Sequence, residues 1–123
     1  MQKIGFVGLG IMGTPMAGHL IKAGHAVSLY SLPHVPAALV DQGGKACASG
    51  KEVAQNADII FIMVPDTPHV ATALFDANGI AEGLSAGKIV VDMSSISPIE
   101  TKEFAARIRA LGCDYLDAPV SGG

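Results

Sequence analysis

Three glycines close to the N-terminus constrain the fold of this chain more than any other feature. Gly8, Gly10 and Gly13 follow the apolar run 3–7, and a helical pattern begins beyond Gly10. A G-x-G-x-x-G pattern has physical meaning in this setting of strand, turn and helix. Gly8 permits the tight turn, Gly10 lets a ligand approach the backbone, and Gly13 lets the helix pack closely against the strand.

The start of the helix after this turn is suited to bind an anion. Its first N–H groups have no partner within the helix and carry a partial positive charge. We therefore interpret the turn as the binding site for the diphosphate of a dinucleotide. The alternative is a tight connection between strand and helix that binds nothing. The candidate contacts are Gly8, Leu9, Gly10, Ile11, Met12 and Gly13.

Short apolar runs alternate with helical stretches along the chain. This alternation predicts βαβ units and an α/β fold of the Rossmann type, a doubly wound parallel sheet in three α/β/α layers. We expect residues 1–123 to form one dinucleotide-binding domain. Segment 76–86 is predicted as a loop with one turn of helix. Strands are predicted at 3–7, 26–30, 45–48, 58–64, 88–92 and 114–116, and helices at 11–23, 35–42, 51–56, 68–75 and 98–111.

Composition excludes several classes of protein. A net charge of −3 without a basic block argues against a nucleic-acid partner. The longest apolar stretch, 59–64, is far shorter than the roughly 20 residues that span a membrane. No signal segment is expected, because the first residues already form a strand. Cys47 and Cys113 stand alone, which fits packing roles in a reducing cytoplasm, and the histidines share no spacing typical of a metal site.

The carboxyl ends of the predicted strands mark the candidate site, because ligands of open parallel sheets bind there. Met63, Val64 and Pro65 end the strand 58–64 and could form an apolar wall beside the nicotinamide ribose, or simply a buried strand end. Further along, Ser94 and Ser95 follow the strand 88–92. Their hydroxyls could reach the nicotinamide or the substrate, or belong to an ordinary polar loop.

Two further strand ends concern the coenzyme preference and the substrate. Ser31 follows the second strand, where an acidic residue would favour NAD and a nearby Arg would favour NADP. Neither is present in 31–34, and our interpretation favours NAD while leaving NADP open. Ser121, Gly122 and Gly123 could bind a carboxylate through a hydroxyl and backbone N–H groups, or form a flexible turn.

The chain offers no candidate catalytic residue. No Ser/His/Asp or Cys/His constellation is credible in this sequence. Reduction of a carbonyl needs a proton donor beside the carbonyl oxygen, and none can be named here. A dinucleotide-binding module without catalysis is therefore one hypothesis for this chain, and the cofactor domain of a reductase is the other.

Segment 5–17 resembles the N-terminal signature of the β-hydroxyacid dehydrogenases, and segments 62–66, 91–98 and 117–123 match that family in order and spacing. Segments 92–100 and 117–123 are most similar to members that reduce 2-hydroxy-3-oxopropionate to glycerate. The resemblance implies an NAD(P)-dependent reductase of a small semialdehyde. The alternatives within the family are a 3-hydroxyisobutyrate dehydrogenase and a reductase of glyoxylate or succinic semialdehyde. Segment 31–33 departs from it, since many relatives carry Asn-Arg or Asp-Arg there.

The resemblance also implies roles for single residues. Residues 8–16 would cradle the dinucleotide, and Val64 and Pro65 would line its path. Ser95 would contact the nicotinamide end, and 121–123 would bind the carboxylate of a semialdehyde or hydroxyacid substrate. Family members carry their catalytic lysine beyond position 123, in an all-helical domain that also forms the dimer, so the intact protein is expected to be a homo-oligomer.

Overall fold

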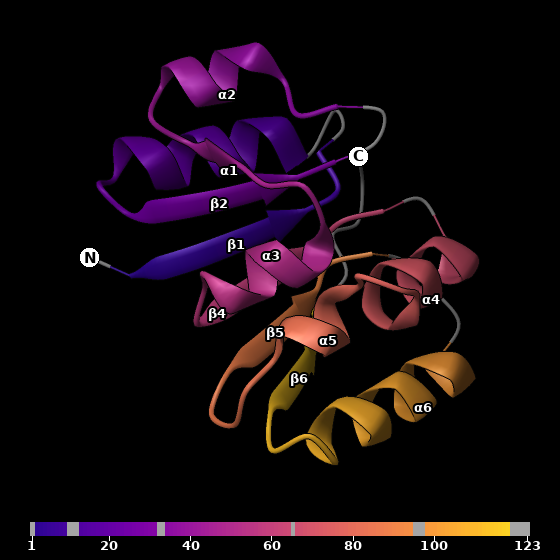
Figure 1. Cartoon of the computed structure of the whole chain (residues 1–123). Coiled ribbons are helices and arrows are strands. Elements are labelled where there is room, and N and C mark those ends of the chain that lie inside the picture. The colour runs from indigo at the N-terminus through magenta and orange to yellow at the C-terminus, as the bar shows by residue number, and fades with distance from the viewer. Residues whose placement is uncertain (1, 10–12, 32–33, 65, 95–97, 119–123) are drawn as a thin grey trace.

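A computed structural model of the chain describes residues 2–9, 13–31, 34–64, 66–94 and 98–118. Within these residues the strands form one parallel sheet in the order β3-β2-β1-β4-β5-β6 (Figure 1). The strands are β1 (Lys3–Val7), β2 (Ala26–Tyr30), β3 (Lys45–Ala46), β4 (Ile59–Ile62), β5 (Ile89–Asp92) and β6 (Asp114–Asp117). The helices are α1 (Gly13–Lys22), α2 (Ala37–Asp41), α3 (Gly50–Gln55), α4 (Thr67–Phe75), α5 (Ile80–Gly83) and α6 (Pro98–Arg109).

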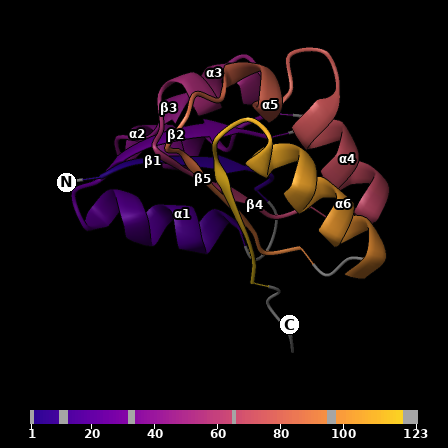
Figure 2. The same cartoon turned by 90° about the horizontal axis from the view of Figure 1, so that it is seen from below.

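Helices cover both faces of the sheet, which confirms the predicted three-layer α/β/α fold. Figure 2 shows α1 on one side of the strands and α3, α4 and α5 on the other. The two faces follow from the period of two along each strand. Phe6 of β1 packs with Ala17 of α1, whereas Val7 packs with Val53 of α3 and Val70 of α4.

The side on which the chain adds new strands to the sheet changes at β1. From β1 the chain builds outward through β2 and β3, then returns to the other side of β1 with β4, β5 and β6. Ile4 of β1 accordingly pairs with Val27 of β2 on one side and with Ile59 of β4 on the other. Such a switch point leaves a crevice at the carboxyl ends of the two central strands.

Helix starts follow the signals in the sequence. Ser49 caps α3, because its hydroxyl accepts a hydrogen bond from the backbone N–H of Glu52 at 3.1 Å. The Glu52 carboxylate in turn accepts one from the N–H of Ala48, the residue before the cap, at 2.7 Å. Asp66 caps α4, because its side chain accepts a hydrogen bond from the backbone N–H of His69 at 3.3 Å. Strands β3 and β4 are shorter than predicted, at Lys45–Ala46 and Ile59–Ile62.

Helices α3 and α5 approach so closely that only glycine fits between them. A Cβ on Gly83 would overlap the backbone carbonyl oxygen of Lys51 and lie 3.0 Å from the Cβ of Ala54. Both obstacles belong to backbone or to a short side chain, so neither can move aside by a rotamer change. The contact therefore fixes the spacing of the two helices over the sheet.

We expect Gly83→Ala to lower the free energy of unfolding by about 2–3 kcal/mol, because the added methyl group overpacks this contact. The matched control is Gly24→Ala, where φ is +93° and a Cβ would meet nothing within 4 Å. That variant should cost only about 1 kcal/mol, the strain of a left-handed alanine. Urea unfolding followed by circular dichroism measures both, and equal losses would contradict the steric explanation.

One carboxyl group lies fully inside the core, at the end of β5. Asp92 is 0% exposed, and its Oδ1 accepts a hydrogen bond from the backbone N–H of Ser94 at 2.9 Å. The phenol of Tyr115 in β6 donates to its Oδ2. Burial raises the pKa of Asp92, and the hydrogen bonds from Tyr115 and Ser94 oppose that increase. Burial also raises the pKa of Tyr115, so the phenol stays protonated and acts as the donor.

The raised pKa of Asp92 predicts that the free energy of unfolding contains a component that falls as the pH rises above about 4. In that window the folded protein binds more protons than the unfolded chain, so raising the pH removes stability. Asp92→Asn removes this titration. Urea unfolding at several pH values should show the advantage of the wild type over the variant declining as the pH rises.

Asp66→Asn provides a control of opposite sign. The hydrogen bond from His69 lowers the pKa of Asp66, so the stability it contributes is present at neutral pH and lost on acidification. The advantage of the wild type over Asp66→Asn should therefore grow as the pH rises. Slopes of the same sign in the two variants would refute the assignment of the buried carboxyl.

Candidate functional site

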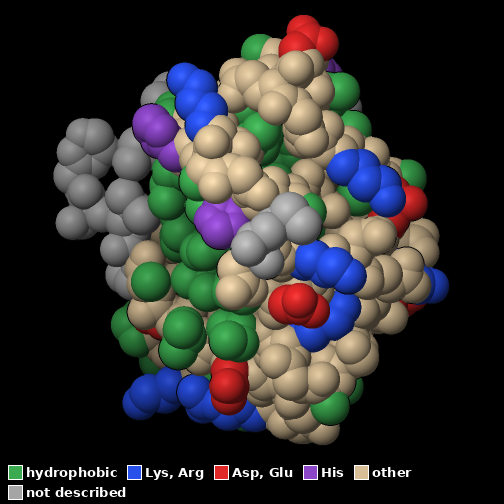
Figure 3. Space-filling model, turned by 90° about the vertical axis from the view of Figure 1, so that its left-hand side faces the viewer, with side chains coloured by type: hydrophobic (Ala, Val, Ile, Leu, Met, Phe, Trp, Pro, Cys, Tyr) green, Lys and Arg blue, Asp and Glu red, His purple; other side chains and the backbone are tan. Residues whose placement is uncertain are grey.

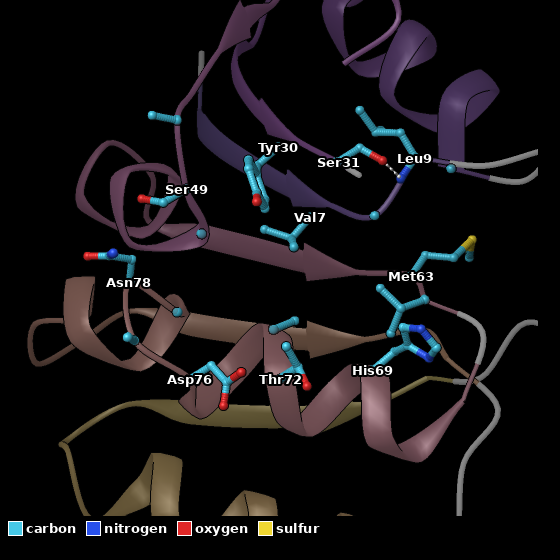
Figure 4. A pocket seen from close by; sticks show the side chains of 18 residues that line it. Val7, Leu9, Tyr30, Ser31, Ser49, Met63, His69, Thr72, Asp76 and Asn78 are labelled. Atoms are coloured by element: carbon cyan, nitrogen blue, oxygen red, sulfur yellow. Dashed lines mark hydrogen bonds between the residues drawn. The ribbon is translucent and has the colours of Figure 1, made fainter. Parts of the chain in front are cut away.

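A cleft of about 780 Å³ opens at the switch point, beside the carboxyl ends of β1, β2 and β4 (Figure 4). Its volume lies within the range of small-molecule and cofactor sites. Figure 4 shows Val7 and Tyr30 on the strand side and Thr72 and Asp76 on the side of α4. The lining residues are Val7, Gly8, Leu9, Gly13, Tyr30, Ser31, Ala48, Ser49, Gly50, Met63, Val64, His69, Thr72, Ala73, Asp76, Ala77, Asn78 and Gly79.

Gly8 and Gly13 belong to this cleft, and both positions exclude a side chain. Gly8 has φ of +91°, and a Cβ there would overlap the carbonyl oxygen of Met63. A Cβ on Gly13 would lie 2.7 Å from the carbonyl oxygen of Gly8. Gly13 also begins α1, so the turn brings the first N–H groups of that helix to the edge of the cleft. This arrangement fits a diphosphate, because those groups lack partners within the helix.

Ser31 lies at the end of β2 and holds the glycine turn. It is 7% exposed, and its Oγ accepts a hydrogen bond from the backbone N–H of Leu9 at 3.0 Å. The backbone N–H of Gly8 donates to the carbonyl of Tyr30 at 2.9 Å. The sequence predicted Ser31 as a contact of the coenzyme, but gave no sign that its side chain also supports the turn after β1.

Met63 and Val64 line the cleft from the end of β4, as the sequence predicted. The N–H of Met63 donates to the carbonyl of Val7 at 3.0 Å, and the N–H of Val64 donates to Ser94 Oγ at 2.9 Å. Ser94 is 3% exposed, so its hydroxyl supports the strand end. The carboxylate of Asp92, the last residue of β5, accepts the backbone N–H of Ser94 at 2.9 Å.

The sequence analysis missed the side of the cleft that α4 provides. His69 and Thr72 line it from one face of α4, and Asp76 lines it from the C-cap position directly after that helix. His69 Nδ1 lies 2.5 Å from Asp66 Oδ1, and this hydrogen bond lowers the pKa of the Asp66 carboxyl. Polar residues at helical spacing directly after a predicted binding strand were the signal that could have identified this face.

Several predicted site residues lie outside the part of the chain that the structure describes. Their assigned roles therefore stay predictions. They are Gly10, Ile11 and Met12 in the turn, Pro65 after β4, Ser95 after β5, and Ser121, Gly122 and Gly123.

Other kinds of site find no support among the described residues. No group of His, Cys, Asp or Glu there could hold a metal ion, and no helix there is long and apolar enough to cross a membrane. Cys47 and Cys113 are buried and unbridged, in keeping with packing roles. On the face in Figure 3, Lys and Arg side chains are scattered, with acidic side chains among them.

Known proteins with a similar sequence or structure include reductases and dehydrogenases. 2-Hydroxy-3-oxopropionate reductase of Escherichia coli (strain K12) is 54% identical over 122 residues, which cover 99% of this chain and 42% of that protein. The structure of 3-hydroxyisobutyrate dehydrogenase from Salmonella typhimurium superposes with a TM-score of 0.87 at 39% identity, covering 98% of this chain and 42% of that one. Psf3 in complex with NADP+ and 2-OPP gives a TM-score of 0.86 at 27% identity, covering 98% of this chain and 43% of that one.

The chain therefore spans less than half the length of these relatives. The comparison confirms the resemblance to the hydroxyacid dehydrogenases that the four sequence segments indicated. A family model described as the NAD binding domain of 6-phosphogluconate dehydrogenase matches residues 3–123, nearly the whole chain. This protein belongs to the family of the NAD binding domain of 6-phosphogluconate dehydrogenase.

Proposed function

We propose that residues 1–123 are the coenzyme-binding domain of a reductase that acts on a small semialdehyde. The observation that carries this proposal is the cleft at the switch point, where the turn after β1 meets the ends of β2 and β4. A bound nicotinamide coenzyme supplies or accepts a hydride. The chain's own residues bind and orient it.

The described residues fit such a coenzyme in three ways. The start of α1 suits its diphosphate. Ser31, at the end of β2, suits the ribose of its adenosine half. Val7, Tyr30 and Val64 offer apolar surface to its rings.

We infer that NAD is preferred over NADP. None of the described residues that line the cleft is Lys or Arg, whereas the carboxylate of Asp76 does line it. A 2′-phosphate would therefore meet no strong cationic partner there, and one negative charge. The helix start favours an anion as well, but it serves the diphosphate common to both coenzymes.

For the complete protein we propose reduction of 2-hydroxy-3-oxopropionate to glycerate. The 54% identity with the Escherichia coli reductase supports this substrate over 3-hydroxyisobutyrate. We assign the substrate carboxylate to Ser121, Gly122 and Gly123, by their match to the family pattern. The proton donor is a lysine beyond Gly123, in a helical domain through which the protein forms a homo-oligomer.

Ser31→Asp tests the coenzyme preference. A carboxylate at the end of β2 accepts a hydrogen bond from the 2′-hydroxyl of NAD and repels the 2′-phosphate of NADP. Isothermal titration should show the dissociation constant for NADP raised by about tenfold or more, and that for NAD within about threefold of the wild type.

Ser49→Asp is the matched control, because it adds the same charge to the same cleft while keeping a good cap for α3. It lies at α3 rather than at the end of β2, so its effect on NADP should be smaller. Equal losses in the two variants would contradict the placement of the adenosine ribose at Ser31.

The reaction is tested by assaying the complete protein with NADH, NADPH and several semialdehydes. We expect the highest kcat/KM with NADH and 2-hydroxy-3-oxopropionate. Turnover mainly with the semialdehyde of 3-hydroxyisobutyrate would establish the alternative substrate. If the protein binds coenzyme but turns over none of the semialdehydes, it is a binding module without this chemistry.

A further inference from the structure

A buried series of hydrogen bonds connects the outer strand β6 to the end of β4. Tyr115 donates its phenolic proton to the carboxylate of Asp92. The same carboxylate accepts the backbone N–H of Ser94 at 2.9 Å, and the hydroxyl of Ser94 accepts the backbone N–H of Val64 at 2.9 Å. The side chains between the two strands lie inside the protein, since Asp92, Ser94 and Tyr115 are 0%, 3% and 3% exposed.

Each acceptor in this series faces a donor. The carboxylate only accepts, so it takes the phenolic proton of Tyr115 and the backbone N–H of Ser94. The Ser94 oxygen then faces the N–H of Val64 with its lone pairs, as the Val64 contact requires. The backbone N–H of Ser94 donates to the same carboxylate at 2.9 Å, which holds Ser94 against the end of β5.

This series ends at the binding edge of the sheet. Val64 lines the cleft, and Ser94 immediately precedes the segment where the sequence places the nicotinamide contact Ser95. A doubly wound sheet binds the two halves of a dinucleotide on opposite sides of its switch point. Ser31 on β2 marks the adenosine side, so the ends of β4 and β5 face the nicotinamide half.

Core packing alone gives no reason for a carboxyl group at this position. A buried carboxylate pays a desolvation penalty that an apolar side chain of similar volume would avoid. Its partner Tyr115 belongs to a core cluster with the apolar residues Ile60, Val90 and Ile108. A costly polar group that fixes two strand ends beside a binding cleft points to a role in ligand binding.

We propose that Tyr115 and Asp92 are positioning residues for the nicotinamide half of the coenzyme, acting through Ser94 on the backbone of Val64. This inference rests on the proposed function. It adds that the affinity for the nicotinamide half depends on a tyrosine in β6 that does not line the cleft.

The test compares two ligands that differ only by the nicotinamide ring. NADH and ADP-ribose share the diphosphate, both riboses and the adenine. Isothermal titration of Ser94→Ala should show NADH binding weakened by about tenfold, and Tyr115→Phe by about fivefold, which corresponds to the loss of part of one hydrogen bond. ADP-ribose binding should stay within about twofold of the wild type in both variants.

A double-mutant cycle shows whether Tyr115 acts through Ser94. If it does, the variant with both substitutions binds NADH no more weakly than Ser94→Ala alone, because the connection is already broken. Ile108→Val is the stability control. It truncates a buried side chain in the same core cluster and should lower the melting temperature without changing either affinity.

Asp92→Asn gives an independent comparison should Tyr115→Phe fold poorly. It keeps an oxygen for the N–H of Ser94 and removes the acceptor for Tyr115. Additive effects in the double variant, or equal losses for NADH and ADP-ribose, would overturn the inference and leave the proposed function intact. If the wild-type chain binds neither ligand, the proposed function itself fails.

Discussion

The close packing of the turn after β1 against the end of β4 is the constraint on which the rest of the site depends. Gly8 has no side chain in the direction of the Met63 carbonyl, so the two central strands can end side by side. This contact sets where α1 begins and therefore where its unpaired N–H groups lie. It also leaves the cleft open between the strand ends and α4. Any larger residue at this point would push the turn away from the sheet.

Polar groups connect the strand ends around that contact into one unit. Ser31 ties β2 to the turn after β1, and Ser94 ties the end of β5 to that of β4. Each hydroxyl is buried and accepts a backbone N–H that no strand partner satisfies. The edge of the sheet thereby acquires a fixed shape before any ligand binds, which lowers the entropy lost on binding.

Backbone and side chains contribute differently to the electrostatics of the cleft. The helix start offers positive character without a cationic side chain, and the described lining residues contribute one carboxylate, that of Asp76, and the imidazole of His69. An anionic ligand is therefore attracted at one place and poorly tolerated elsewhere in the cleft. Such a distribution favours a ligand whose charge is concentrated in a central diphosphate.

The sequence by itself determined the fold class and the turn. Apolar runs and helical stretches alternate so regularly that every strand and helix of the described chain was predicted, with errors only at their ends. Gly8, Gly13, Ser31, Met63 and Val64 were predicted as site residues because parallel strands present their carboxyl ends at one edge. These inferences depend on local pattern and on a general rule of topology, and both can be read along the chain.

Only the tertiary structure decided which side chains support that edge and which face it. Asp92 and Tyr115 are 23 positions apart and meet because β5 and β6 are neighbours in register. Likewise, α4 adds His69 and Thr72 to the cleft, and its C-cap adds Asp76, through the way the helix packs over the sheet. A contact between residues distant in sequence depends on strand order, register and helix packing, and periodicity along the chain does not contain that information.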